Sequence, residues 1–408
     1  MAAAAKTVQK HMQESEQEHI TRRTSSFKEV ESTMPHLPTR FRDASLVDNL
    51  SSYLGKRNPF TKQVDPKKHI VWIFDNTAWQ IPGSNGWAAE FVAAYFVKRS
   101  GSDVSAVVAD IAEKCGLAKG DKQEATIAKR LEPFVDSILP AHTVKMQIAK
   151  SQTVRLGPSG RDGISNDTIR FATKYDNLTS VISDALSVEC DEMTTFTAGP
   201  TGWAVLSDVD DTIKRTLTAD PIGILKTTFV DEPEAIPGMP ELYAHMKTAL
   251  GNPPFWYLSA SPYNLYTFLR DFRRKYYPAG QMILREASWM NLAGLLTNLT
   301  QGTQAYKVDR MEKVHAHWPK RKFIVVGDST QTDPESYGEM YRKHPDWIKA
   351  IFIRKVTGVA AVNEEAKISD ERFEKAFAGV PRDVWTVFEE PNVLYAKVDA
   401  LVKGEGQK

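Results

Sequence analysis

One short segment of this chain of 408 residues gives the first indication of its fold. The apolar run Trp203–Leu206 (WAVL) predicts a buried strand, and it passes directly into Ser207–Thr212 (SDVDDT). Asp208 and Asp210 are two residues apart, so a strand, or the loop that continues it, would aim both carboxyl groups to the same side. The segment therefore predicts a polar site at the end of a strand.

The sequence on the C-terminal side repeats this pattern of apolar runs. Three further runs predict strands: Phe255–Leu258, Phe323–Val326 and Ala350–Ile353. Segments with helical character lie between or beside them: 262–275, 307–318 and 334–342. Apolar strands that alternate with helices indicate a parallel sheet covered on both faces. The fold class that we predict is α/β.

Polar clusters also follow the second and third predicted strands. The second strand runs into Ser259-Ala260-Ser261, and the third into the segment 327–333 (GDSTQTD). In an open parallel sheet, ligands bind beyond the carboxyl ends of the strands. Three separate strands would therefore bring carboxylates and hydroxyls to one edge of the sheet.

Four aspartates at this edge predict a metal site: Asp208, Asp210, Asp328 and Asp333. Like charges within a few ångströms are costly unless a cation neutralises them. The expected ligands are all oxygens, which favours Mg²⁺ over Zn²⁺. A carboxylate-held Mg²⁺ beside hydroxyls and a lysine suits a phosphoryl group.

The residue types suggest a role for each side chain. Asp208 would attack phosphorus and form an aspartyl-phosphate. Asp210 would protonate the leaving oxygen and then deprotonate the water that hydrolyses the intermediate. Ser259 and Lys307 would bind the phosphoryl group, the serine by a hydrogen bond and the lysine by its charge. The Thr212 hydroxyl would orient Asp210 or cap the following turn.

Several of these residues have a plain structural alternative. Lys307 could lie on the solvated face of a helix, and Ser261 fits the position of an N-cap. Asp333 fits an N-cap too, although a capping carboxylate can still contact a metal. We expect Asp211 to hydrogen-bond the loop, and Asp75-Asn76-Thr77 to be structural, because it lacks the first aspartate of the motif.

A zinc-type site is not expected from the histidines or the cysteines. His315 and His317 are two residues apart in a predicted helix, so they do not share a face. Cys115 and Cys190 are the 2 cysteines of the chain, too few for a zinc site or a disulfide framework.

The order of the motifs resembles that of the haloacid dehalogenase superfamily of phosphatases. Its features are Asp-x-Asp-x-Thr at a strand end, Ser after a second strand, Lys at a helix start and Gly-Asp-x-x-x-x-Asp after another strand. The local sequences of 207–214, 257–265 and 327–335 are similar to those of the fungal actin-patch-protein type of phosphatidate phosphatase. The resemblance covers residues 200–360 and extends weakly into 72–114.

The resemblance implies a haloacid dehalogenase-like (Rossmannoid) catalytic domain and a Mg²⁺-dependent hydrolase that converts phosphatidate to diacylglycerol. It also implies a link to endocytosis and to proteins of cortical actin patches. The proline-rich tail of the yeast prototype, which binds SH3 partners, has no counterpart before Lys408, so that partnership is not expected. Two alternatives stay open: a phosphoprotein or soluble phosphomonoester phosphatase, and an actin-patch scaffold or lipid-binding protein with secondary activity.

The chain divides into four predicted parts. Residues 1–66 are a polar, partly disordered N-terminal tail, and 67–200 are a mixed, β-rich accessory domain. Residues 201–360 are the phosphatase catalytic domain, and 361–408 are a helical C-terminal extension. The intervals between the motifs leave no room for a large lid domain, which suits a phosphate presented on something large, such as a membrane or a protein. Apolar residues in 286–299 would either form a lip beside the site or simply pack in the core.

Composition narrows the function classes. Lys and Arg number 52 against 51 Asp and Glu, so the chain lacks the basic field that drives nucleic-acid binding. Few cysteines indicate a reducing compartment. No apolar run approaches the roughly 18 residues of a membrane span, and the start lacks the apolar core of a signal peptide. We expect a cytoplasmic protein, peripheral at membranes or cortical actin patches, that meets phosphatidate at the membrane surface.

Overall fold

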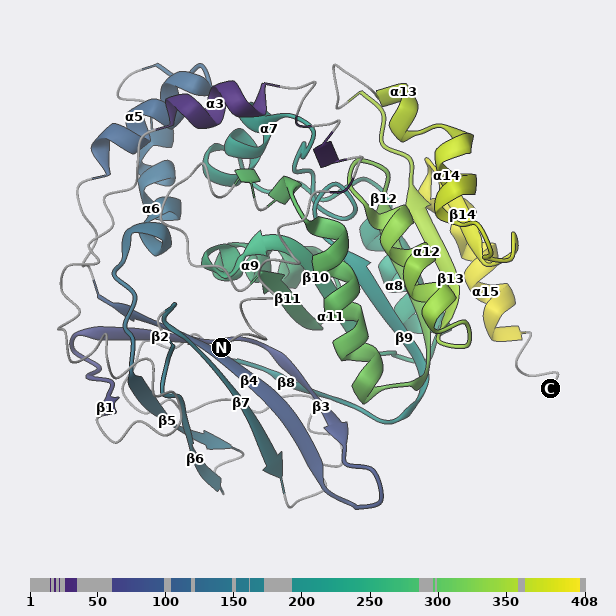
Figure 1. Ribbon diagram of the computed structural model, residues 1–408, viewed down its shortest axis with the longest axis horizontal. Helices are drawn as coiled ribbons and strands as arrows, with labels where there is room; N and C mark the ends of the chain where they lie inside the picture. Colours follow the sequence, from purple (N-terminus) through teal and green to yellow (C-terminus); the bar gives the residue numbers. More distant parts are fainter. Residues whose placement is uncertain are drawn as a thin grey trace.

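The fold was analysed in a computed structural model of the chain. It describes residues 15, 18, 19, 22, 26–34, 61–98, 104–118, 122–148, 152–160, 162–171, 193–285, 296, 297, 299–358 and 364–403. These residues form a parallel-sheet unit, from Thr201 onward, and a β-rich unit that precedes it in the sequence (Figure 1). The predicted α/β class with a mixed, β-rich accessory region is confirmed.

The parallel-sheet unit has six strands in the order β11-β10-β9-β12-β13-β14, and every neighbouring pair is parallel. The strands are β9 (Thr201–Asp208), β10 (Phe255–Pro262), β11 (Gln281–Arg285), β12 (Lys320–Asp328), β13 (Ile348–Arg354) and β14 (Trp385–Phe388). The four predicted strands are the central ones. The two short edge strands, β11 and β14, were not predicted, and β14 shows that the segment after residue 361 is not purely helical.

The central strands read as continuous apolar runs because helices cover both faces of the sheet. In β9, Val205 and Leu206 point to opposite faces and both are fully buried. Ile324 and Val325 of β12 are equally buried. An apolar strand with no alternation is thus the sequence signature of this sheet.

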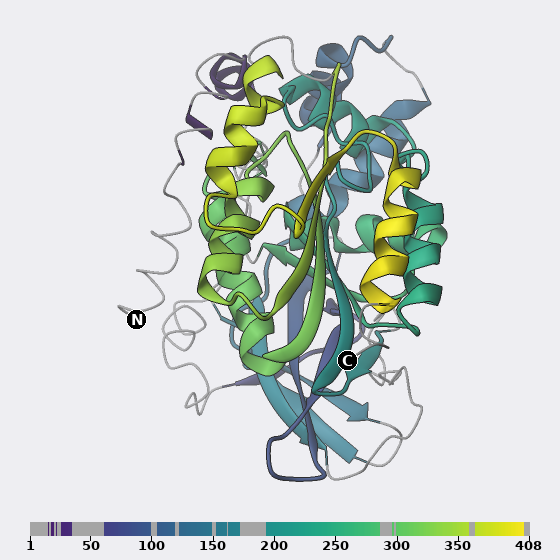
Figure 2. The same cartoon turned by 90° about the vertical axis from the view of Figure 1, so that its right-hand side faces the viewer.

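Two helical layers enclose the sheet, as Figure 2 shows edge-on. Side chains of α11, α12 and α14 pack in one apolar core, and those of α8, α9 and α15 pack in the core on the other face. The helices of this unit are α7 (Pro221–Leu225), η3 (Lys226–Val230), α8 (Met239–Ala249), η4 (Tyr263–Leu265), α9 (Tyr266–Tyr276), α11 (Thr303–His317), α12 (Asp333–Lys343), α13 (Glu364–Lys367), α14 (Asp370–Ala376), η5 (Pro391–Leu394) and α15 (Tyr395–Lys403).

Two predicted N-caps were wrong. Strand β10 continues through Ser261 to Pro262, and α9 begins only at Tyr266, so Ser261 is not an N-cap. The N-cap of α12 is Thr332, and Asp333 is the first helical residue rather than the cap. In both places the side chain that looks like a local cap is instead turned toward the candidate site.

The β-rich unit is built around the long strand β4, which pairs with β2, β3 and β7. Its strands are β1 (Lys62–Gln63), β2 (His69–Ile73), β3 (Asn76–Gln80), β4 (Trp87–Val97), β5 (His142–Ile148), β6 (Gln152–Leu156), β7 (Ile164–Phe171) and β8 (Thr195–Ala198), and its helices are α5 (Ser105–Lys114) and α6 (Gln123–Val135). A separate small sheet has the order β1-β5-β6.

A buried aspartate joins the two units. Asp75 lies 2.9 Å from Arg273 of α9, and its carboxylate also accepts a hydrogen bond from the backbone of Thr194. Its own backbone N–H donates to the Tyr266 hydroxyl at 2.6 Å. The structural interpretation of Asp75-Asn76-Thr77 is confirmed: this aspartate anchors the β-rich unit to the helix that follows β10.

Part of the predicted N-terminal tail packs against the parallel-sheet unit. Helix α3 (Phe27–Thr33) places the Phe27 ring, which is fully buried, in the same apolar core as α8 and α9. The rest of that predicted tail, and most of the predicted apolar lip in 286–299, lie outside the described residues. Among the described helices, none combines the length and the apolar character that crossing a membrane requires.

Candidate active site

Three aspartates meet at the carboxyl ends of the central strands. Asp208 is the last residue of β9, Asp328 is the last residue of its neighbour β12, and Asp333 lies in the first turn of α12. One carboxylate oxygen from each lies within 4.8 Å of the others, and all three side chains are buried. We call these three residues the acidic cluster.

Lys307 lies inside this cluster. Its ammonium is 2.7 Å from Asp208 Oδ1, forms an ion pair with Asp333 and donates a hydrogen bond to Gln331 Oε1. The side chain is fully buried, so the alternative of a solvated helix face is wrong. Burial lowers the pKa of Lys307, but Asp208 and Asp333 outweigh that effect and raise it, so the lysine stays charged.

Asp210 lies among hydroxyl groups instead. Its Oδ2 accepts hydrogen bonds from Ser259 Oγ at 2.6 Å and Ser261 Oγ at 3.2 Å, and its Oδ1 accepts one from Thr216 Oγ1 at 2.8 Å. The structure therefore brings Asp210 and Ser259 together. It does not place the Asp210 carboxylate in the acidic cluster, so its role as a metal ligand stays a prediction.

The loop after β9 holds two further predicted residues. Thr212 Oγ1 lies 3.1 Å from Asp208 Oδ2 and 3.2 Å from Asp328 Oδ2, so it orients these two carboxylates rather than Asp210. Asp211 has φ 59°, a left-handed conformation that aspartate tolerates. Its carboxylate accepts hydrogen bonds from the backbone N–H groups of residues 216–218, which is the loop-holding role expected of it.

A glycine allows Asp333 to lie against strand β12. A Cβ atom at Gly327 would collide with the Asp333 carboxylate. Asp333 Oδ2 also accepts the backbone N–H of Asp328 at 3.0 Å, and Asp328 Oδ1 accepts that of Thr330 at 2.6 Å. The loop backbone thus fixes both carboxylates, and the missing side chain at Gly327 is part of the site.

The electrostatics of the acidic cluster favour a bound cation. Burial, followed by the charge of Asp333, raises the pKa of Asp208 well above its ordinary value, and the same two causes raise the pKa of Asp328. Among the described residues, Asp208 Oδ1 has the Lys307 ammonium, at 2.7 Å, as its one polar partner. One lysine does not balance three buried carboxylates, and their oxygens suit a hard divalent ion, so the cluster could bind a metal.

The sequence analysis missed several residues that support the site. Lys214 is buried beside Asp210 and donates to Thr216 Oγ1 at 3.1 Å; burial lowers its pKa. Arg372 of α14 donates to the backbone carbonyls of Ser329 and Gln331 and so holds the loop after β12. No local pattern distinguishes such residues from surface lysines and arginines.

Side chains from the loops after β9 and β12 and from the N-terminal segment line a small cavity near the start of α11. The hydroxyls of Thr218 and Thr330 meet at 2.9 Å, and Gln331 Nε2 donates to the Leu299 carbonyl at 3.1 Å. The Glu18 carboxylate accepts the backbone N–H of Thr303, the first residue of α11, at 2.7 Å. This cavity has a volume of about 20 Å³, and none of the residues that line it belongs to the acidic cluster.

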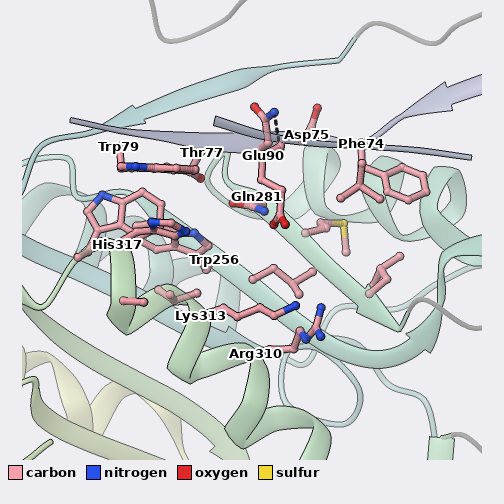
Figure 3. Close-up of a pocket in the computed structure, with 18 residues that line it drawn as sticks. Phe74, Asp75, Thr77, Trp79, Glu90, Trp256, Gln281, Arg310, Lys313 and His317 are labelled. Atoms are coloured by element: carbon pink, nitrogen blue, oxygen red, sulfur yellow. Dashed lines mark hydrogen bonds between the residues drawn. The ribbon is translucent and has the colours of Figure 1, made fainter. Parts of the chain in front are cut away.

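A larger cavity, of about 290 Å³, lies elsewhere between the two units (Figure 3). Strands β3 and β4 form one wall, and β11 and α11 form the other. Thr77 Oγ1 and Trp256 Nε1 are buried at this cavity without a hydrogen-bond partner. None of the predicted catalytic or metal-binding residues lines it, so it is separate from the acidic cluster.

Comparison with known proteins agrees with this geometry. Residues 203–355 match the catalytic domain of the phosphatidate phosphatase APP1. All of the acidic cluster, Asp210, Thr212, Ser259 and Lys307 lie inside the matched segment, whereas α14 and the β-rich unit lie outside it.

Two fungal relatives also match the chain. Phosphatidate phosphatase APP1 of Saccharomyces cerevisiae is 25% identical over 248 residues, which cover 58% of this chain and 41% of the yeast protein. An uncharacterized protein of Schizosaccharomyces pombe is 26% identical over 159 residues, which cover 38% of this chain and 25% of that protein. The chain thus spans less than half the length of the relatives it matches.

Proposed function

We propose that this chain is a phosphatidate phosphatase that converts phosphatidate to diacylglycerol and inorganic phosphate. The observation that carries the proposal is the acidic cluster around Lys307, with Asp210 two residues after Asp208, in a segment that matches the catalytic domain of the phosphatidate phosphatase APP1. A protein that only binds lipid would not need both Asp208 beside a charged lysine and a second buried aspartate, Asp210, two residues later.

The acidic cluster would hold Mg²⁺, with Asp210 as a further predicted ligand. Carboxylate oxygens are the ligands that this ion prefers in proteins. When bound, the ion would neutralise charge on the cluster and on the phosphoryl group. Support for this assignment comes from the unbalanced buried charge of three carboxylates around one lysine.

Asp208 is the proposed nucleophile. Its carboxylate oxygen would attack phosphorus, and the bond between phosphorus and the oxygen of diacylglycerol would break. The Thr212 hydroxyl at 3.1 Å orients the carboxylate. The Lys307 ammonium, 2.7 Å away, would stabilise the negative charge that develops on the phosphoryl oxygens.

Asp210 is the proposed general acid and base. It would give its proton to the departing oxygen of diacylglycerol, and then take a proton from the water that attacks the aspartyl-phosphate. That second attack breaks the bond between phosphorus and Asp208 and releases inorganic phosphate. Ser259 now donates its single hydroxyl proton to Asp210 at 2.6 Å, so it must turn that proton to a phosphoryl oxygen when substrate binds.

The proposed site of action is the membrane surface, with the protein peripheral to the membrane and on its cytoplasmic side. Phosphatidate is the substrate named for the yeast relative. A role at cortical actin patches and in endocytosis belongs to the same proposal and rests on the motif resemblance alone.

A substrate panel tests the proposal. Phosphate release is measured with phosphatidate, lysophosphatidate, a phosphoserine peptide and p-nitrophenyl phosphate, with Mg²⁺ and with a chelator. We expect phosphatidate with Mg²⁺ to be the preferred condition, Asp208→Asn to abolish release, and the control Asp346→Asn, at a fully exposed position, to leave it unchanged. Preference for the peptide, or full turnover by Asp208→Asn, would refute the proposal.

A further inference from the structure

A second group of metal-binding side chains lies away from the acidic cluster. Glu312 and His315 are on α11, and His344 directly follows α12, the helix that packs beside it (Figure 1). One ligand atom from each of the three lies within 4.8 Å of the others. We call these three residues the histidine site.

The helix geometry explains why these side chains converge. Glu312 and His315 are three residues apart, so they are neighbours on one face of α11. His344 Nε2 lies 2.8 Å from Glu312 Oε2, and the rings of His344 and His315 stack with their centroids 3.6 Å apart. The His344 and Glu312 side chains are 24% and 35% exposed, so an ion from solvent can reach them.

The donor set suits a different ion from the one proposed for the acidic cluster. Two imidazoles and one carboxylate bind Zn²⁺ and similar transition metals, and they leave a fourth position for water. Such an ion holds its ligand atoms about 3.3 Å apart. Because the stacked imidazole rings lie nearly parallel, with an interplanar angle of 21°, one ring would turn about its side-chain bonds when the ion binds. Burial, and then the nearby His344, lower the pKa of His315 and so favour the neutral imidazole that metals bind.

We propose that Glu312, His315 and His344 form a binding site for a divalent transition-metal ion of the zinc type. The ion takes the place of the proton that His344 Nε2 now shares with Glu312 Oε2. It also displaces Lys343, whose ammonium lies 3.5 Å from Glu312 but has Glu339 as a closer partner at 2.9 Å. The inference is independent of the proposed phosphatase activity.

The site would brace two helices that carry catalytic candidates. His315 lies eight residues after Lys307, which is about 12 Å farther along the helix axis. His344 closes the helix that begins with Asp333. Binding at the histidine site would therefore tie together the far ends of α11 and α12 without touching the acidic cluster.

The sequence analysis judged the wrong pair of histidines. His317 stacks on Trp79 of the β-rich unit, with 3.7 Å between the ring centroids, and is not part of the histidine site. The partner of His315 comes from the adjacent helix, a contact that helix periodicity alone does not reveal. The site needs no cysteine, so the low cysteine count does not exclude it.

Zinc binding to the full chain tests the proposal. The metal-stripped protein is dialysed against Zn²⁺ in excess Mg²⁺, so that the acidic cluster is supplied with its preferred ion. We expect one tightly bound Zn²⁺ per chain. In His344→Ala and His315→Ala the affinity should fall by about a hundredfold or more, because losing a ligand costs at least as much as losing its supporting group. The matched control is His245→Ala, which removes a histidine–carboxylate pair of 2.9 Å to which the described residues add no third ligand.

A second readout identifies the ligands. Co²⁺ in the same site should give the strong visible absorption of four-coordinate cobalt, and Glu312→Gln and His344→Gln should abolish this absorption. Because the Glu312 and His344 side chains are partly exposed, these two variants test the site even if His315→Ala does not fold. Equal Zn²⁺ affinity in the parent chain and in the His344 variants, or no tight Zn²⁺ in the parent, overturns the inference. Phosphate release in Mg²⁺ is a separate measurement, so failure of one proposal does not decide the other.

Discussion

At the scale of single residues, the most telling feature is the buried Lys307. Its ammonium contacts two carboxylates of the acidic cluster, and no solvent reaches it. Removing one partner of a buried ion pair leaves an uncompensated charge, which is costly. The position of this lysine thus links catalysis to stability.

We predict that Lys307→Met abolishes phosphate release and lowers the free energy of unfolding by about 3 kcal/mol or more. Denaturant unfolding and a phosphate assay measure the two effects. Lys313→Met, on the exposed side of the same helix, is the control and should change neither. A Lys307→Met protein with parental activity would exclude the proposed charge stabilisation.

Gly327 provides a second test at this scale. An added Cβ would collide with the Asp333 carboxylate, so Gly327→Ala should push that group away from the cluster. We predict at least a tenfold loss of phosphate release, about 1.4 kcal/mol in transition-state stabilisation, and weaker activation by Mg²⁺. Gly199→Ala, where the nearest atom would be 3.8 Å away, is the control. Unchanged Mg²⁺ activation in Gly327→Ala would contradict this account of Asp333.

At the scale of elements, the N-terminus of α11 depends on a residue far away in the sequence. Glu18 accepts backbone N–H groups from Gly302 and Thr303, and it also accepts the N–H of Ser15. One carboxylate therefore accepts hydrogen bonds from backbone N–H groups at the start of α11, the helix that carries Lys307. These groups have no partner within the helix, so Glu18 acts as a capping side chain does.

We predict that Glu18→Ala lowers the free energy of unfolding by about 1 kcal/mol, the usual cost of a lost cap. Glu18→Gln should lose less, because its amide oxygen still accepts a hydrogen bond. The exposed Glu29→Ala on α3 serves as the control, and thermal unfolding measures all three. If Glu18→Ala and Glu29→Ala have the same free energy of unfolding, Glu18 does not stabilise the protein by capping α11.

At the scale of elements, some strands and helix starts could be predicted from the sequence and others could not. Central strands such as β9 and β12 were predictable, because burial on both faces leaves an unbroken apolar run. The edge strand β14 was not, because its four residues are flanked by helices and give no such signal. The start of α9 was misplaced because Ser261 satisfies a local capping rule, while a tertiary contact with Asp210 keeps it in β10.

At the scale of the whole molecule, the missing information is mostly long-range contact. The convergence of Asp208, Asp328 and Asp333 followed from strand order in a parallel sheet. The burial of Lys307, the cap by Glu18 and the anchor between Asp75 and Arg273 did not, because each joins segments that are remote in the sequence. Local pattern therefore gives the site's acids but not the groups that hold them.

Stability should depend on pH in the metal-free protein. Burial first, and then Asp333, raise the pKa of Asp328 from 3.8 to about 7, so the folded protein retains a proton that the unfolded chain releases. A raised folded-state pKa means that the free energy of unfolding falls as pH rises between these values, by about 1 kcal/mol per pH unit. We predict that thermal unfolding in chelator shows this decline, and that Mg²⁺ reduces it. A stability that rises over this range would contradict the buried, unbalanced cluster.

The account rests on Asp208 as a covalent nucleophile, and one measurement tests it most directly. Phosphatidate labelled in its phosphoryl group is mixed with the protein and Mg²⁺, the reaction is quenched in acid, and peptides are mapped by mass spectrometry. We predict a phosphoryl group on Asp208 that is absent in chelator and in Asp208→Asn. Steady turnover with no modified Asp208, or with the label on another residue, would contradict the account.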